Sequence, residues 1–275
     1  MNNMSKRNCE VADAKRVDEA MALIHISSYA EASHILLLVI KNTPKNYLHT
    51  TDVNGTLYMR FWDQGEFINF VKKSPPSQPT YWVKSAYPRA YFYLGFLSAA
   101  EGRLQNAIEY LDTGALLEPT NPRFNTEKAH ALLKMGCYSE ALLAVDGING
   151  PGPHVSESMF GVVLRSRGAS LIELGDLQAA ERTFVLSLEY APDNNVALNQ
   201  IQYIRKLVFS GKHTTATIVS TVTKADGAIV CKSCRTNNTS GTLDVSGDPR
   251  SFICHKCKLV KSNKVAPKKF WQFWN

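Results

Sequence analysis

Two stretches decide the fold, residues 95–119 (GFLSAAEGRLQNAIEYLDTGALLEP) and residues 168–192 (GASLIELGDLQAAERTFVLSLEYAP). Both carry small residues and a proline at steps of 7, 5 and 12 residues: Gly95, Gly102, Ala107 and Pro119 in the first, and Gly168, Gly175, Ala180 and Pro192 in the second. Small side chains at this spacing let two helices pack closely, and a proline ends the second helix. The shared spacing therefore predicts a helical hairpin that occurs more than once along the chain.

The repeated hairpin resembles the tetratricopeptide repeat (TPR), a helix–turn–helix unit of about 34 residues. Two looser copies of the pattern lie at residues 20–44 and 129–153, and repeat starts fall near Asp13, Pro88, Pro122, Gly161 and Asn195. One such unit cannot bury its apolar face alone, so neighbouring units share a continuous core. The resemblance implies an all-α, TPR-like α-solenoid of helical hairpins over residues 1–210.

Residues 47–87 depart from this pattern, and we interpret them as one atypical repeat. The sequence Asp63-Gln64-Gly65-Glu66 is a capping box, which predicts a helix over residues 67–73. Residues 56–62 alternate in polarity as a short strand does, whereas the repeat context requires a helix there. We favour the helix. The proline-rich residues 74–79 predict a loop.

The strongest candidate site is a set of four cysteines: Cys231, Cys234, Cys254 and Cys257. They form two C-x2-C pairs with 19 residues between them, which is close to the spacing of a four-thiolate zinc ribbon. Four sulfur ligands close the coordination sphere of Zn²⁺, which predicts one structural ion. Disulfides and a redox pair are the alternatives. We expect a linker at 211–225, a small β-hairpin zinc ribbon at 226–262 and a basic, aromatic tail at 263–275.

The net charge of +7 is unevenly distributed. Residues 211–275 hold 11 Lys and Arg against 3 Asp and Glu, whereas the other residues are nearly balanced. This excess favours an acidic partner for the C-terminal part, such as nucleic acid, an anionic membrane surface or an acidic protein. Alternatively, the lysines only keep a small module soluble. In the tail, Trp271 and Trp274 are candidate contacts to a partner, to bases or to a membrane surface, or they pack against the chain itself.

The TPR resemblance also implies a groove, lined by fixed positions of the first helix of each repeat. In this sequence those positions include Arg89, Phe92, Phe96, Arg123, His130, Lys134 and Arg165. Basic and aromatic side chains together suit an extended peptide that carries acidic side chains or a C-terminal carboxylate. The alternative is that the aromatic rings pack between helices and that the charges are solvated.

Several function classes find no support in the sequence. The longest apolar run is residues 35–40, far shorter than a membrane span, and no secretory signal is recognisable. Phosphate-loop, dinucleotide, zinc-protease and serine-hydrolase motifs are absent. We therefore predict a cytoplasmic, non-enzymatic scaffold or adaptor that binds a protein through its helical repeats, with the ribbon and tail as a second contact. The alternative is a nucleic-acid-associated regulatory factor that uses the basic ribbon.

Overall fold

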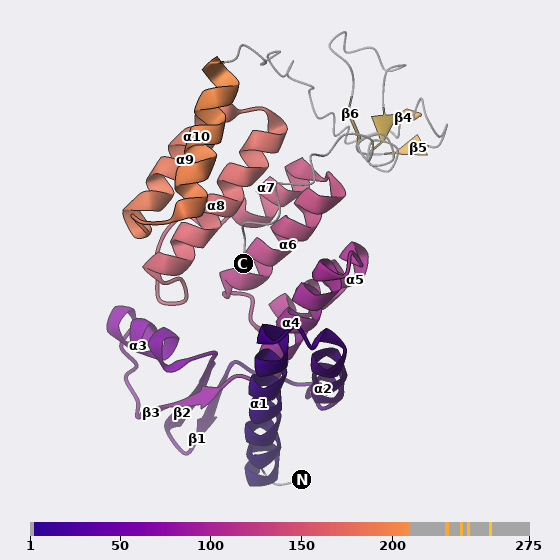
Figure 1. Ribbon diagram of the computed structural model, residues 1–275. Coiled ribbons are helices and arrows are strands. Elements are labelled where there is room, and N and C mark those ends of the chain that lie inside the picture. Colours follow the sequence, from indigo (N-terminus) through magenta and orange to yellow (C-terminus); the bar gives the residue numbers. More distant parts are fainter. Residues whose placement is uncertain (1–2, 210–228, 231–236, 239–240, 243–252, 255–275) are drawn as a thin grey trace. The chain divides into compact units, whose positions relative to one another are not determined.

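The computed structural model describes residues 3–209 and the strand residues 229–230, 237–238, 241–242 and 253–254, with side chains for residues 9–209 (Figure 1). The chain divides into two compact units. The first consists of Met1–Ala131 with Ala144–Val163, and the second consists of Leu132–Leu143 with Leu164–Asn275. No helix within residues 3–209 is long and apolar enough to cross a membrane.

Helical hairpins make up most of residues 3–209. The helices are α1 (Asn3–His25), α2 (Tyr29–Lys41), α3 (Gln64–Lys73), α4 (Tyr87–Ala100), α5 (Leu104–Leu117), α6 (Pro122–Met135), α7 (Tyr138–Asp146), α8 (Glu157–Leu174), α9 (Leu177–Tyr190) and α10 (Asn195–Phe209). Helices α4, α6 and α10 begin at or beside predicted repeat starts, and α8 begins four residues before Gly161. The predicted TPR-like arrangement of hairpins is confirmed.

Glycine brings the two helices of a hairpin together, as the spacing predicts. Gly95 in α4 faces Leu111 in α5, and a Cβ atom at position 95 would lie 2.6 Å from Cγ of Leu111. Gly168 in α8 faces Phe184 in α9, where a Cβ atom would lie 2.7 Å from the ring. Leu111 and Phe184 are completely buried. Each large side chain therefore fills the space that the opposite glycine leaves.

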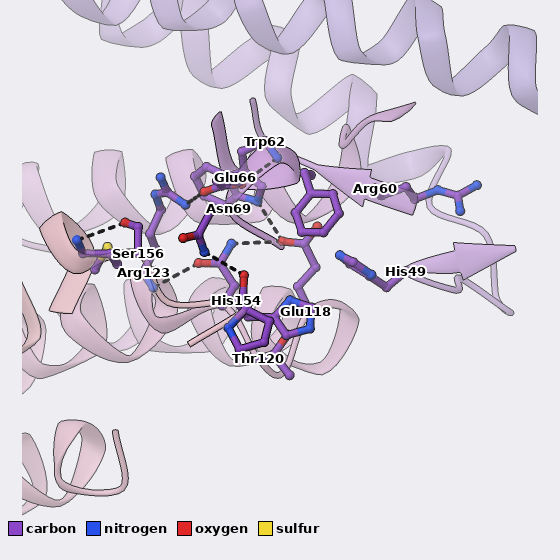
Figure 2. Close-up of a pocket in the computed structure, with 14 residues that line it drawn as sticks. His49, Arg60, Trp62, Glu66, Asn69, Glu118, Thr120, Arg123, His154 and Ser156 are labelled. Atoms are coloured by element: carbon purple, nitrogen blue, oxygen red, sulfur yellow. Dashed lines mark hydrogen bonds and ion pairs between the residues drawn. The ribbon is translucent and has the colours of Figure 1, made fainter. Parts of the chain in front are cut away.

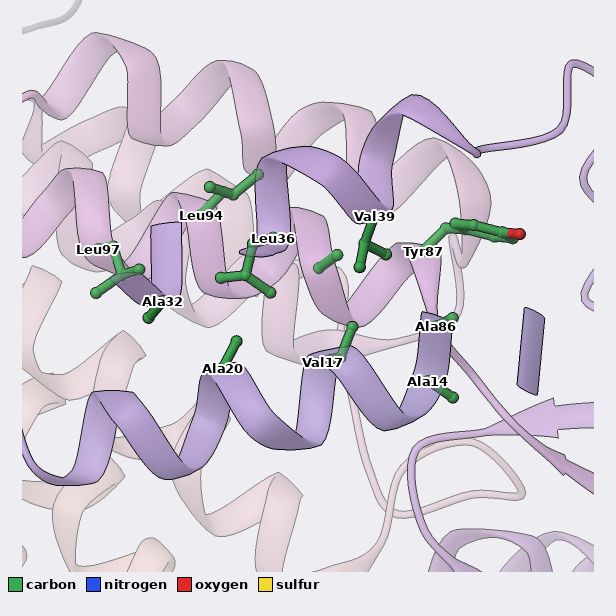
Figure 3. Packing of buried hydrophobic residues seen from close by; sticks show 11 residues of the cluster. Ala14, Val17, Ala20, Ala32, Leu36, Val39, Ala86, Tyr87, Leu94 and Leu97 are labelled. Carbon is green, nitrogen blue, oxygen red and sulfur yellow. The ribbon is translucent and has the colours of Figure 1, made fainter. Parts of the chain in front are cut away.

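An apolar core of the first unit lies between α1, α2 and α4 (Figure 3). Its buried members are Ala14, Val17 and Ala20 of α1, Ala32, Leu36 and Val39 of α2, and Ala90, Leu94 and Leu97 of α4, with Ala86 and Tyr87 at the start of α4. On each helix the buried residues recur every three or four positions, which places them on one face. This core holds the N-terminal helices against the first well-formed hairpin.

The atypical segment contains a sheet, so the all-α prediction is wrong for the first unit. Strands β1 (Thr50–Val53), β2 (Thr56–Phe61) and β3 (Thr80–Lys84) form a sheet in the order β1-β2-β3. Strands β1 and β2 are antiparallel, and β2 and β3 are parallel.

The helix that we favoured at residues 56–62 is also wrong, since residues 56–61 form β2. The reason lies in the turn before it: Asn54 and Gly55 both have positive φ, at 53° and 78°, as a two-residue hairpin turn requires. The predicted helix and its N-cap are confirmed, because a side-chain oxygen of Asp63 accepts a hydrogen bond of 2.9 Å from the amide of Glu66, at the start of α3. The second bond of the predicted capping box differs, since the carboxylate of Glu66 accepts from the amide of Trp62 (2.9 Å).

Two short antiparallel strand pairs are described near the C-terminus. Strand β4 (Ile229–Val230) pairs with β5 (Asn237–Asn238), and β6 (Gly241–Thr242) pairs with β7 (Ile253–Cys254). The predicted linker, the rest of the predicted ribbon and the predicted tail lie outside the described residues.

Candidate functional site

The three groove residues predicted on α4 all make contacts within the first unit. Arg89 is 2% exposed, and it donates hydrogen bonds to Asp18 Oδ1 (2.5 Å) and to the carbonyl oxygen of Ser85 (3.1 Å). The ring of Phe92 packs edge-on against Trp62, with 5.1 Å between centroids. Phe96 is partly buried against the α1–α2–α4 core. These contacts give each side chain a packing role that needs no partner protein.

The predicted groove residues of α6 differ in exposure. Arg123 forms an ion pair with Glu66 and lies over the Trp62 ring, 4.7 Å from its centroid. His130 is half-buried, and its Nδ1 lies 3.6 Å from a carboxylate oxygen of Glu127. Lys134 is exposed. Of these three, Arg123 is thus already committed to a carboxylate of the same unit.

Arg165, on the part of α8 in the second unit, is the exception among the predicted basic residues. The residue is 8% exposed, and its Nη1 has no hydrogen-bond partner among the described residues. Burial lowers the pKa of the Arg165 guanidinium, and no described carboxylate offsets that effect. By contrast, Arg60 is similarly buried, but its Nε lies 2.9 and 3.0 Å from the two carboxylate oxygens of Glu10. Arg165 is therefore a buried cation without a described counter-ion.

A polar pocket that sequence reasoning missed lies within the first unit, around Trp62 and Glu118 (Figure 2). Glu118 is 3% exposed, and its carboxylate accepts hydrogen bonds from Trp62 Nε1 (2.7 Å), Ser85 Oγ (2.9 Å) and Asn121 Nδ2 (3.1 Å). Burial nevertheless raises the pKa of Glu118, against the effect of these donors. The carboxylate joins strand β2, the start of α4 and the α5–α6 turn.

Two histidines line the same pocket. The rings of His49 and His154 lie edge to face, 5.9 Å between centroids, and both are close to Phe61. Burial lowers the pKa of His49 to about 4, and the neighbouring His154 and Arg60 add to this effect. Burial also lowers the pKa of His154. Both rings are thus held in the neutral form near pH 7.

The pocket is built as a joint between segments. Its cavity measures about 30 Å³, which is room for one or two water molecules. Asn69 of α3 donates hydrogen bonds to the carbonyl oxygens of Gly152 (3.0 Å) and Pro153 (2.9 Å), and so holds the loop before α8. The geometry fixes the inserted sheet and α3 to the α5–α6 turn, and it leaves too little space for a substrate.

Most of the remaining predicted site residues cannot be placed. Cys231, Cys234, Cys257, Trp271 and Trp274 lie outside the described residues, and Cys254 is described only by its backbone, in β7. Within the part of the chain that has described side chains, no cluster of three His, Cys, Asp or Glu could hold a metal ion.

No protein-family model matches this sequence, and no curated protein matches it. Among solved structures, the chain is similar to the first TPR domain of Spaghetti (RPAP3) bound to the HSP90 peptide SRMEEVD, at 22% identity over 44% of this chain and 93% of that one, with a TM-score of 0.39. It is similar to the first TPR domain of human RPAP3, at 22% identity over 46% and 96% of the two chains (TM-score 0.41), and to MamA 41-end from Desulfovibrio magneticus RS-1, at 15% identity over 74% and 89% (TM-score 0.46).

Proposed function

We propose that this chain is a non-enzymatic scaffold whose TPR-like helical hairpins bind an acidic segment of a partner protein. The proposal rests on the burial of Arg165 in α8 and on the missing hydrogen-bond acceptor for its Nη1 among the described residues. A partner carboxylate at this position would supply the missing counter-charge.

Burial of the Arg165 charge without a counter-charge is energetically costly. A charged group removed from water costs several kcal/mol unless it is paired and hydrogen-bonded. The guanidinium is planar and binds a carboxylate through two parallel hydrogen bonds, so an aspartate, a glutamate or a C-terminal carboxylate fits it best. Because the arginine side chain is long and flexible, a change of rotamer brings the charged end to the surface during binding.

The test compares Arg165→Gln with a matched control, Arg205→Gln. Arg205 lies on α10 of the same unit, is mostly exposed and pairs with Glu181 at 2.6 Å. The full-length chain is applied to an array of synthetic peptides that are equal in length and differ in net charge. We expect acidic peptides to be retained, Arg165→Gln to weaken their retention strongly and Arg205→Gln to leave it unchanged. Equal retention of acidic and neutral peptides, or equal effects of the two substitutions, would refute the proposal.

A structural zinc ion at Cys231, Cys234, Cys254 and Cys257 is the second part of the proposal. It is supported by the spacing of the four thiols, and by the antiparallel pairs next to them, since β4 ends just before Cys231 and β7 ends at Cys254. The thiols must stay reduced to bind the metal, so a reducing, cytoplasmic setting belongs to this proposal. Elemental analysis of the freshly purified chain tests it, with one zinc per chain expected and none in Cys231→Ser.

The aromatic tail completes the proposed adaptor. Trp271 and Trp274 follow a pair of lysines at the end of the printed sequence, and we assign them a second contact to a protein partner. Alanine replacements at both positions test this assignment. They should weaken capture of a partner by the full-length chain and leave the retention of acidic peptides on the array unchanged.

A further inference from the structure

Strand β3 is an outer strand of the sheet in the first unit, and half of its peptide groups have no described partner. Among the described strands it pairs only with β2. The amide of Ser85, directly after β3, donates to the carbonyl of Phe61 (2.9 Å). Because alternate residues of a strand face the same neighbour, the main-chain groups of Tyr81 and Val83 also face β2. Those of the intervening residues, Thr80, Trp82 and Lys84, face away from the sheet. Within the described residues these outward main-chain groups make no hydrogen bond.

Little in the sequence of β3 protects this edge. Proteins usually block a free strand edge with a central charge, a proline or a bulge. The opposite edge strand, β1, is only four residues long and carries Asp52, whose side chain accepts a hydrogen bond from the amide of Gly55 (2.9 Å). In contrast, β3 reads TYWVK, and its one charged residue, Lys84, lies at the end and pairs with Asp18. The edge is therefore a ready template for another strand.

A cavity of about 280 Å³ lies beside this edge, between the sheet and α1. Its walls include Val11 of α1 together with Tyr58, Tyr81 and Val83 of the sheet. The rings of Tyr58 and Tyr81 are stacked, with 5.7 Å between centroids and 22° between planes. Val11 is 49% exposed and Tyr81 is 59% exposed, so the cavity opens to the surface.

The chemistry of the cavity selects an uncharged side chain. Its two charged residues, Arg60 and Glu10, bind each other through both carboxylate oxygens, and Arg60 Nη1 also donates to the carbonyl of Leu48 (2.8 Å). Neither charge is free for a ligand. The other walls are apolar or aromatic, which favours an aromatic or branched apolar group.

We propose that β3 binds an extended segment of a partner protein by strand addition, and that this segment places one aromatic or branched apolar side chain in the cavity beside Tyr81. Main-chain hydrogen bonds to the outward groups of Thr80, Trp82 and Lys84 hold the segment, and the cavity supplies specificity. This site is separate from Arg165: it lies in the first unit and it does not use charge. The two sites together would let one chain hold two different segments.

The test uses a matched pair of proline substitutions. Thr80→Pro removes an outward amide from β3 and leaves its pairing with β2 intact, because proline is tolerated where the amide faces solvent. Thr50→Pro is the control on the opposite edge. The carbonyl of His49 accepts from the amide of Arg60 (3.0 Å), so the next residue, Thr50, faces away from β2. A third variant, Val11→Glu, places a charge at the cavity and leaves the strand unchanged.

The probe is a displayed library of random peptides, selected on the full-length chain and then measured as synthetic peptides. We expect selected peptides to carry an apolar residue within a stretch that alternates in polarity as a strand does. Their affinity for Thr80→Pro and for Val11→Glu should be about tenfold or more weaker. Thr50→Pro and Arg165→Gln should bind them normally, and added salt should change little. Circular dichroism of each variant checks that the helices are intact.

Four results would overturn the proposal. The library yields no β3-dependent peptide; Thr80→Pro and Thr50→Pro weaken binding equally; the selected peptides depend on Arg165 instead of Thr80; or the full-length chain forms a dimer that Thr80→Pro dissociates, which would make a second copy the occupant of the edge. The third result would leave the acidic-segment proposal standing, whereas failure of the peptide array alone would leave the β3 site standing.

Discussion

The indole Nε1 of Trp62 donates a hydrogen bond of 2.7 Å to the carboxylate of Glu118, and both residues are buried. The two residues are 56 positions apart in the chain, one at the end of the inserted sheet and the other after α5. A buried carboxylate is tolerated only where donors surround it, so this bond helps to join the insertion to the repeats.

Replacing Trp62 with phenylalanine removes this donor from a buried carboxylate. We expect Trp62→Phe to lower the free energy of unfolding by about 1–3 kcal/mol, measured by urea denaturation. Trp82→Phe is the matched control, because Trp82 Nε1 donates to a neutral carbonyl, that of Phe61, at 3.2 Å. Its loss should be the smaller one. Equal losses would show that the charge of Glu118 does not matter.

The two hairpin glycines allow a test of close helix packing. Gly168→Ala places a methyl group 2.7 Å from the ring of Phe184, and we expect a loss of about 1–3 kcal/mol in unfolding free energy. Gly147→Ala is the control, since nothing lies within 4 Å of a Cβ atom there. Thermal denaturation of both variants measures the difference. A neutral Gly168→Ala would contradict the packing role of this glycine.

These glycines also explain why the repeats were predictable from the sequence. A close contact between two helices requires a small residue at a fixed spacing, and Gly95 and Gly168 make this requirement recognisable in the sequence. The sheet was less visible. Residues 56–61 fit either a strand or a helix of a degenerate repeat, and it is the Asn54–Gly55 turn that favours the strand. The run TYWVK of β3, between a proline-rich loop and a helix, is a further strand signal.

The candidate sites, like the fold, were predictable from the sequence only in part. The position of Arg165 within its repeat was enough to name it as a candidate binding residue. That it has no counter-ion among the described residues was not predictable, because pairing depends on which side chains the fold brings near, as it brings Glu10 to Arg60 across 50 residues. The contact of Trp62 with Glu118 is of the same kind, since neither residue belongs to a motif.

Arg60 and Arg165 predict opposite responses to the loss of a buried charge. Arg60→Met leaves the buried carboxylate of Glu10 unpaired, and we expect it to lower the unfolding free energy by about 3–5 kcal/mol. Arg165→Met removes a cation that has no described partner, so the chain should keep its stability or gain about 1 kcal/mol. Urea denaturation without any peptide compares them. A large loss in Arg165→Met would indicate a structural role for Arg165.

The pH dependence of stability tests the pocket around His49. Its pKa is about 4 in the folded chain and about 6.5 in the unfolded chain, so the unfolded chain binds more protons between these values. Stability contributed by the neutral ring is therefore present at pH 7 and is lost as the pH falls, by about 2 kcal/mol at pH 5. We expect His49→Asn to remove this part of the loss, measured as urea midpoints at both pH values. An unchanged difference between pH 7 and pH 5 would contradict the burial of a neutral His49.

Removal of the proposed zinc ion should separate the C-terminal part from the helices. We expect Cys257→Ser, or a strong chelator, to release the metal and to leave the helical circular dichroism signal of the chain nearly intact. Loss of most of the helical signal would show that the helices depend on the metal, against the independent ribbon that we propose.

The most direct test of the central claim is a double-mutant cycle between Arg165 and one acidic residue of an array-selected peptide. Calorimetry measures the binding free energies of the peptide and of its Glu→Gln version, each with the natural chain and with Arg165→Gln. If the guanidinium binds that carboxylate, the two changes should be coupled by about 1.5–3 kcal/mol. Additive losses, with a coupling of about 0.3 kcal/mol or less, would mean that Arg165 does not contact the acidic segment.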